Sequence, residues 1–242
     1  MGMKVYAIIL AGGTGARLGT AVPKQYLRVN GRMIIEYCMD IIASHEMIDG
    51  IQLVVSDEWK RDLERIIESF PSDKKNKFTG FSIPGENRQL SIYHALQDLS
   101  NIADADDCIM IHDAARPLLM AEQISVCVNK LVEQDGRYDG VMPVLPMKDT
   151  VYLCENGESV SSLLNREQIF AGQAPEFFRY GKYFEANKAL LQDEILKING
   201  STEPAIMAGM NIAMVAGDEG NFKITTAVDL ERFREVIERS EK

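Results

Sequence analysis

Short apolar runs that alternate with longer segments of helical periodicity constrain the fold of this chain more than any other feature. The apolar runs cover residues 5–10, 51–55, 78–83, 108–112 and 140–143, and the amphipathic segments cover residues 34–44, 58–70, 91–99 and 121–133. Strands joined by crossover helices are typical of a mostly parallel sheet. We therefore predict an α/β protein, a Rossmann-like three-layer sandwich. Such sheets bind ligands where the strands end, so the loops after Leu10, Ile83 and His112 are expected to share one site.

The pattern changes between residues 147 and 170. Here "KDTVYL" and "CENGESVSSL" resemble two short strands joined by a turn at Asn156-Gly157. A hairpin at this place would leave the main sheet, either as a β-arm that packs on a second subunit or as a solvent-exposed flap. A helix over 183–193, a strand over 213–215 and a helix over 227–239 are predicted to follow. We find no linker or repeat, so residues 1–242 are expected to form a single domain.

Charge and composition exclude several classes of partner. The formal net charge is −10, whereas nucleic acids and anionic membranes bind surfaces rich in Lys and Arg. No apolar run approaches the about 20 residues that span a bilayer, and no secretion signal is evident, so we expect a cytoplasmic protein. The three histidines and four cysteines lack zinc-ligand spacing, and the cysteines are expected to be reduced.

The stretch "LAGGTGARL" follows the first predicted strand directly. Gly12, Gly13 and Gly15 would let backbone N–H groups approach a polyphosphate. The spacing is not GxGxxG and no lysine-hydroxyl pair follows, so neither a dinucleotide turn nor a P-loop is predicted. A tight strand-to-loop turn remains an alternative. In so acidic a chain, Arg17 and Lys24 nearby favour a local phosphate site.

Asp113 ends the apolar run 108–112 and leaves two interpretations open. Its carboxylate is a hard oxygen ligand of the kind that Mg²⁺ prefers. It would equally serve as a helix cap or as a salt-bridge partner of Arg116.

Several blocks together carry a resemblance to a known family. "LAGGTGARLG" with "PKQYL" resembles the signature of the sugar-nucleotidyltransferase fold, and more closely that of the cytidylyltransferases that act on polyol phosphates. The segments "PGENRQLSIYHAL", "IHDAARPLL", "NREQIFAGQAPEFF" and "NFKITTAVDL" agree, in order, over nearly the whole chain. The resemblance implies transfer of CMP from CTP to a polyol phosphate with Mg²⁺ and release of pyrophosphate. It also implies a homodimer built partly by the 147–170 arm.

The resemblance also assigns roles to individual residues. It implies a metal ligand at Asp113 and catalytic cations at Arg17, Lys24 and Lys223. The implied nucleotide-binding residues are Leu10, Ala11, Gly12, Gly13, Thr14, Gly15, Gly85, Glu86, Arg88, Ser91 and Ala114, and the implied acceptor-binding residues are Thr150, Arg166, Ala174 and Thr202. Ser91 would alternatively cap the following helix. No general base is expected, because the attacking phosphate is already ionised and catalysis is mainly electrostatic and positional.

Two departures from the family pattern concern the acceptor. Ala174 stands where the family usually has Thr, and Thr202-Glu203-Pro204 stands where it usually has Thr-Asp. A lost hydroxyl changes discrimination between polyols strongly. The resemblance narrowly favours 2-C-methyl-D-erythritol 4-phosphate as acceptor, with ribitol 5-phosphate as the alternative. Use of UTP or GTP with a sugar 1-phosphate, and a CTP-binding homologue without catalysis, remain competing hypotheses, whereas glycine spacing disfavours an oxidoreductase.

Overall fold

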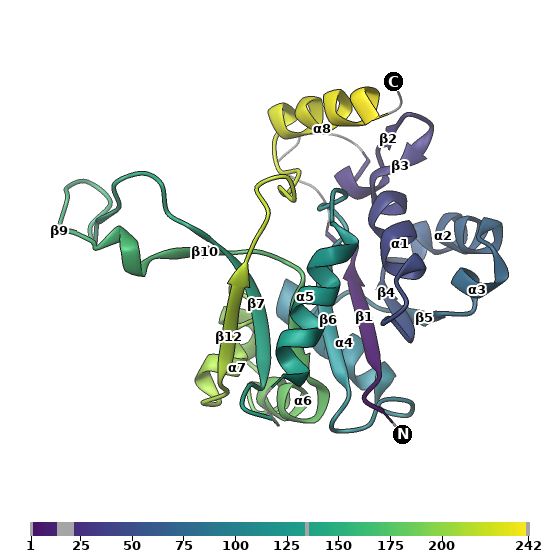
Figure 1. The fold of residues 1–242 in the computed structure, drawn as a ribbon, viewed down its shortest axis with the longest axis horizontal. Coiled ribbons are helices and arrows are strands. Elements are labelled where there is room, and N and C mark those ends of the chain that lie inside the picture. The colour runs from purple at the N-terminus through teal and green to yellow at the C-terminus, as the bar shows by residue number, and fades with distance from the viewer. Residues whose placement is uncertain (1, 14–21, 134–135, 241–242) are drawn as a thin grey trace.

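A central sheet organises the computed structural model, which describes residues 2–13, 22–133 and 136–240. Within these residues the sheet has eight strands (Figure 1). Seven follow the order β10-β7-β11-β6-β1-β4-β5, and the eighth, β12, pairs in parallel with β7. The strands are β1 Val5–Leu10, β4 Gly50–Val54, β5 Phe78–Ser82, β6 Cys108–Asp113, β7 Gly140–Pro146, β10 Phe170–Gly172, β11 Glu176–Arg179 and β12 Ile212–Ala216. Only β10 and β11 run antiparallel to their neighbours among these described strands.

Helices cover both faces of this sheet, which makes three layers. The described α-helices are α1 Ile34–Ser44, α2 Asp57–Ser69, α3 Ser72–Lys75, α4 Arg88–Leu99, α5 Ala121–Val132, α6 Tyr180–Lys188, α7 Glu203–Met207 and α8 Ala227–Ser240. Of these, α8 packs on Ile34 and Val29 beyond the ends of the strands (Figure 1). Alternate β1 side chains point to opposite faces. Ala7 and Ile9 pack in the core that α1 and α5 cover, whereas Tyr6 and Ile8 pack in the core that α4 and α6 cover. The predicted fold class is therefore confirmed.

Most predicted helices and strands agree with the observed ones, and the differences have local causes. The predicted strands and amphipathic helices are present, and the helix over residues 34–44 has the bounds observed for α1. β10 and β11 were not predicted, because their apolar runs are short and Pro175 stands directly before β11. The helix predicted from Ser91 begins at Arg88, since the side chain of Asn87 accepts a hydrogen bond from Leu90 N at 2.8 Å. The interpretation of Ser91 as a helix cap is therefore wrong.

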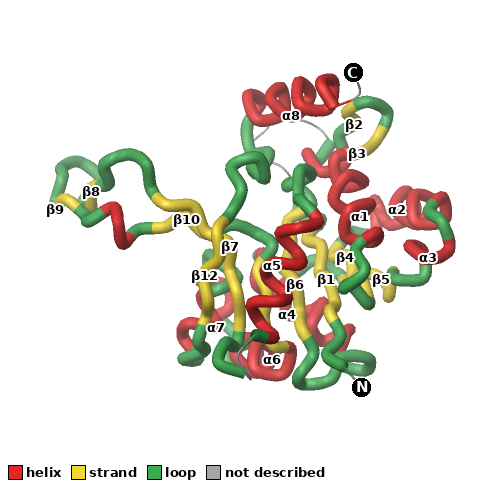
Figure 2. The backbone as a smooth tube through the Cα atoms, in the orientation of Figure 1, coloured by secondary structure: helices red, strands yellow, loops and turns green. Residues whose placement is uncertain are grey.

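The hairpin leaves the main sheet, as predicted. β8 Tyr152–Leu153 and β9 Ser162–Leu163 pair only with each other in the described chain, and Figure 2 shows both far from the main sheet. Figure 2 shows that most of this arm is loop, with a short 3₁₀ helix, η3 Arg166–Gln168. At its tip, Asn156 Oδ1 accepts hydrogen bonds from the amides of Glu158 and Ser159, both at 3.0 Å. Separately, no described helix is long and apolar enough to cross a membrane.

Candidate active site

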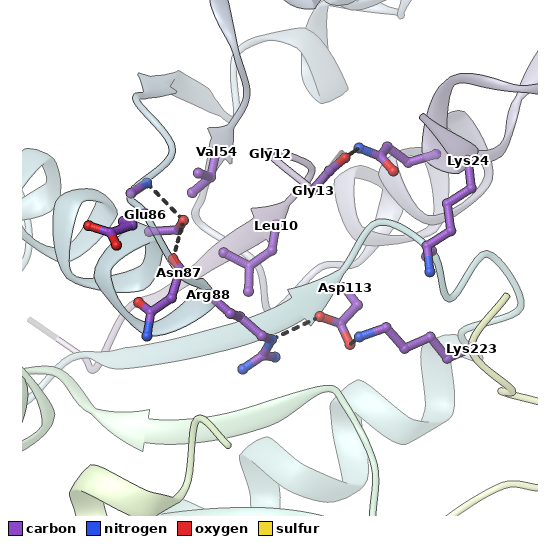
Figure 3. A pocket seen from close by; sticks show the side chains of 14 residues that line it. Leu10, Gly12, Gly13, Lys24, Val54, Glu86, Asn87, Arg88, Asp113 and Lys223 are labelled. Carbon is purple, nitrogen blue, oxygen red and sulfur yellow. Dashed lines mark hydrogen bonds and ion pairs between the residues drawn. The ribbon is translucent and has the colours of Figure 1, made fainter. Parts of the chain in front are cut away.

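A pocket of about 460 Å³ lies where β1, β4 and β6 end (Figure 3). The last residues of these strands, Leu10, Val54 and Asp113, all contribute to its wall. The remaining lining residues are Gly12, Gly13, Lys24, Gln25, Gly85, Glu86, Asn87, Arg88, Ser91, Ala115 and Lys223. The three loops predicted to share a site therefore do meet, because neighbouring parallel strands end at the same edge of the sheet.

The glycine loop after β1 is held by side chains from the next turn. This turn is the 3₁₀ helix η2, Lys24–Tyr26. Gln25 Nε2 donates to Ala11 O at 2.6 Å and to Gly13 O at 2.7 Å, and Tyr26 Oη donates to Ala11 O at 3.0 Å. The stretch "PKQYL" therefore supplies one cation to the pocket and two donors that fix the loop's carbonyl groups.

Gly12 and Gly85 permit close approaches between chain segments. A Cβ atom on Gly12 would lie 2.6 Å from both Cβ and Cγ of Pro84, and one on Gly85 would lie 2.6 Å from side-chain atoms of Leu90. Real Cβ atoms do not approach so closely. At Gly13, by contrast, no atom of the described residues outside its chain neighbours lies within 4 Å of the Cβ position. Gly12 thus serves packing between two pocket loops, whatever its contact with a ligand.

Asp113 is the centre of charge in the pocket. Lys223 Nζ donates to its Oδ2 at 2.8 Å, Arg88 Nε donates to its Oδ1 at 3.2 Å, and Arg116 Nε lies 3.8 Å from Oδ2. Burial favours the neutral carboxyl, but the three cations outweigh that effect and hold the pKa of Asp113 well below its usual range. Asp113 is therefore a carboxylate, and the salt bridge to Arg116 that the sequence left open is present.

The loop after β6 is held together behind the pocket. Arg116 Nη1 donates to Asn221 O at 2.6 Å, and Ile224 N donates to Ala115 O at 2.9 Å. His112 Nε2 lies 3.0 Å from Arg116 O, and complete burial lowers the pKa of His112 to about 4. The imidazole is therefore neutral at pH 7, and Nε2 donates to the carbonyl. These bonds fix the chain that carries Lys223 against the end of β6.

Polar and charged side chains line the pocket from two sides. Figure 3 shows Lys24 and Lys223 on one side of the pocket, opposite Glu86 and Asn87. Ser91 Oγ accepts from Gly85 N at 2.9 Å and donates to Asn87 O at 2.8 Å. The Ser91 hydroxyl thus shapes the loop that precedes α4.

Several predicted site residues lie elsewhere. Ala11 and Ala114 are buried beneath the pocket, with Ala114 N donating to Leu10 O at 3.1 Å. Thr150 and Arg166 are exposed on the arm, and Ala174 and Thr202 are buried. Thr14, Gly15 and Arg17 lie outside the described residues.

Four lining residues were missed by sequence reasoning, namely Gln25, Val54, Asn87 and Ala115. Asn87 carried a usable signal, because an Asn just before a periodic apolar segment is a typical helix N-cap. Gln25 carried no such signal in the sequence. Its side-chain amide donates to Ala11 O and Gly13 O, and these contacts form only when the chain is folded.

The oxygen donors of the pocket suit Mg²⁺ that enters with a phosphate ligand. Among the described residues, no three His, Cys, Asp or Glu side chains come together to hold a metal ion by themselves. Mg²⁺ is commonly held by one or two carboxylates, with substrate phosphates and water completing the shell. The Asp113 carboxylate in the pocket wall fits that pattern.

Comparisons with known proteins identify the family of the chain. Residues 5–239 match the family model described as 2-C-methyl-D-erythritol 4-phosphate cytidylyltransferase. The chain is 33% identical to the protein of that name from Thermotoga neapolitana, covering 98% of each chain. It is 29% identical to a ribitol-5-phosphate cytidylyltransferase from Streptococcus agalactiae, covering 97% of this chain and 95% of that one. The crystal structure of 2-C-methyl-D-erythritol 4-phosphate cytidylyltransferase from Francisella tularensis matches with a TM-score of 0.78 and 25% identity, covering 96% and 99%.

Proposed function

This chain belongs to the 2-C-methyl-D-erythritol 4-phosphate cytidylyltransferase family and is a cytidylyltransferase, and on that premise we propose that 2-C-methyl-D-erythritol 4-phosphate accepts CMP from CTP. Pyrophosphate is the leaving group. The observation that carries the proposal is the pocket at the ends of β1, β4 and β6, whose wall combines Lys24, Arg88 and Lys223 with Gly12 and Gly13. In a chain of net charge −10, this concentration of cations suits a triphosphate.

The proposed mechanism follows from the charges. An oxygen of the acceptor phosphate attacks the α-phosphorus of CTP, a new P–O bond forms, and the bond to pyrophosphate breaks with its electrons. Lys24 and Lys223 offset the negative charge of the two phosphate groups and of the leaving group. The attacking oxygen is already ionised at pH 7, so no side chain has to remove a proton. Arg88 and Arg116 keep Asp113 charged and in place beside Lys223.

We include Mg²⁺ in the proposal. Asp113 would hold the ion, which when bound would shield the triphosphate charge. The cytoplasmic location expected from the sequence stays a prediction.

The test is an acceptor panel. Purified protein is incubated with CTP, Mg²⁺ and one polyol phosphate at a time, and pyrophosphate release is measured, with UTP and GTP as nucleotide controls. Release with 2-C-methyl-D-erythritol 4-phosphate and CTP is expected to exceed release with any other pair. CTP binding without turnover on any acceptor would instead support a non-catalytic homologue.

Ribitol 5-phosphate is the second candidate acceptor. Its support is the Streptococcus agalactiae relative, which matches over nearly the whole of both chains. Faster turnover of ribitol 5-phosphate in the same panel would replace the first candidate and leave the pocket chemistry unchanged.

We also propose that the arm makes a homodimer. Its support is the exposure of large apolar side chains on the arm, including Tyr152, Val160, Leu163 and Phe170. Exposed apolar groups gathered on a protruding segment mark interaction surfaces. Sedimentation equilibrium of the purified protein is expected to give the mass of two chains, and a monomer at all concentrations would contradict the proposal.

A further inference from the structure

A buried carboxylate lies behind the pocket without lining it. Glu176 is the first residue of β11 and is only 9% exposed. A buried carboxylate is retained in a fold only where hydrogen bonds and opposite charges compensate its lost hydration. Its partners therefore show what Glu176 does.

Three groups surround the Glu176 carboxylate. Thr202 Oγ1 donates to Oε1 at 2.8 Å, the hydroxyl of Ser201 is hydrogen-bonded to Oε2, and Arg88 Nη2 lies 3.8 Å from Oε2. Ser201 Oγ also accepts from Arg88 Nη1 at 2.8 Å. Because a hydroxyl has one proton to give and can still accept, Ser201 bridges the guanidinium to the carboxylate.

These contacts hold Arg88 through its two terminal nitrogens, Nη1 and Nη2. On its other side, Arg88 Nε donates to Asp113, which also binds Lys223. Burial raises the pKa of Glu176, and the neighbouring Arg88 guanidinium works against that rise. With Glu176 ionised, charges of opposite sign alternate from Glu176 through Arg88 and Asp113 to Lys223. A planar guanidinium bonded on two edges has one orientation, so Glu176 and Ser201, together with Asp113, fix the orientation of Arg88 in the pocket wall.

The same contacts bear on Thr202, which the family resemblance assigns to the acceptor. Thr202 is buried, and its hydroxyl proton is directed at Glu176. A hydroxyl has only one proton to donate. Thr202 therefore serves the carboxylate behind Arg88.

We propose that Glu176, held by Ser201 and Thr202, is a positioning residue that fixes Arg88 and thereby the Asp113–Lys223 pair for the nucleotide triphosphate. The inference rests on the proposed function for the identity of the ligand. It predicts that disturbing this set weakens nucleotide binding, not recognition of the polyol.

The test distinguishes effects on nucleotide binding from effects on acceptor binding. Ser201→Ala removes the bridge, Glu176→Gln removes the charge with little change of shape, and Thr202→Val removes one hydroxyl while keeping the volume. We expect Ser201→Ala and Glu176→Gln to raise the calorimetric Kd for CTP about tenfold, the effect of losing one bond to a charged group. The KM for the polyol phosphate is expected to stay within twofold. Thr202→Val should act in the same direction, and Thr202→Ser, which keeps the hydroxyl, should restore CTP binding.

Two controls keep the result interpretable. Ser125→Ala removes a hydroxyl that contacts His45 at 3.0 Å, far from the pocket, and should leave both constants unchanged. A raised acceptor KM with unchanged CTP Kd would overturn the proposal in favour of direct acceptor contacts. A lowered Tm with both constants unchanged would reduce Glu176 to a structural role. Failure of wild-type turnover on every acceptor would contradict the proposed function, while the CTP measurements still decide the positioning role.

Discussion

The pocket and the arm differ in how their side chains find partners. In the pocket, Asp113 is neutralised by cations from three separate segments of the same chain. On the arm, no residue from 147 to 172 is buried, and the bonds are local, such as Arg166 Nη1 to Lys148 O at 2.8 Å. One chain is therefore enough to organise the charges of the described pocket residues, whereas the arm's large apolar side chains are exposed in the single chain, which is the basis of the proposed dimer. The following predictions test this contrast, from the largest expected effect to the smallest.

Lys24→Ala tests whether the pocket cations carry the chemistry. Loss of this charge is expected to lower kcat by about 10³-fold, the range seen when an electrostatic stabiliser of a transition state is removed. Lys24 lies in the pocket wall, so the circular dichroism spectrum should not change. Lys188→Ala on the exposed face of α6 is the matched control. A Lys24→Ala protein with wild-type kcat would remove Lys24 from the chemistry.

His112→Gln tests whether the buried His112, behind the pocket, makes the stability of the protein depend on pH. The folded-state pKa of about 4 lies below the unfolded value of about 6.5, so the unfolded state binds the proton first as the pH falls. Stability is therefore present above pH 6.5 and is lost as the pH falls towards 4. Gln does not titrate. Between pH 7 and pH 4, the free energy of unfolding of His112→Gln, measured in urea, should therefore fall by roughly 3 kcal/mol less than that of the wild type. His94→Gln, on the partly exposed side of α4, is the control, and equal pH curves for wild type and His112→Gln would contradict the prediction.

Gly12→Ala and Gly13→Ala form a matched pair in the glycine loop. The Cβ on residue 12 would collide with Pro84, whereas residue 13 has open space. Overpacking costs about 1–3 kcal/mol, so Gly12→Ala should lower the free energy of unfolding by that amount. Gly13→Ala should change it by less than about 0.5 kcal/mol. Equal effects in denaturant titrations would show that the loop moves freely away from Pro84.

Leu163→Asp tests the arm. This side chain is 65% exposed in the single chain, so a charge there costs the folded monomer little. If it is covered in a dimer, the dimer dissociation constant should rise about tenfold or more, because a charge would be buried without a partner. Sedimentation velocity checks the shift, and CTP affinity, which belongs to the pocket, is expected to stay within twofold. Unchanged sedimentation would place the subunit contact elsewhere.

Some features of the fold and the pocket were predictable because they are local. Apolar periodicity identified β1 and α1, and the end of each apolar run located Leu10 and Asp113 at the edge of the sheet. The placement of Gly12, Gly13 and Lys24 in the pocket also followed from their order along one loop. Their roles in binding and catalysis stay predictions.

Other features depend on contacts between distant parts of the chain. Arg88 reaches Ser201 across 113 positions, and Lys223 reaches Asp113 across 110. The bond from the Thr202 hydroxyl to Glu176, across 26 positions, is another such contact, and the acceptor role that the family resemblance implies for Thr202 stays a prediction.

By itself, the sequence determined the layers, the strand edge where the site forms and the residue types that a phosphate ligand requires. Only the tertiary structure decided that Gln25 holds the glycine loop, that β10 and β11 enter the sheet antiparallel, and that Glu176 stands behind Arg88. The physical reason is that periodicity records which side of an element is buried. Which side chains meet there is decided by packing between elements that the chain order leaves far apart.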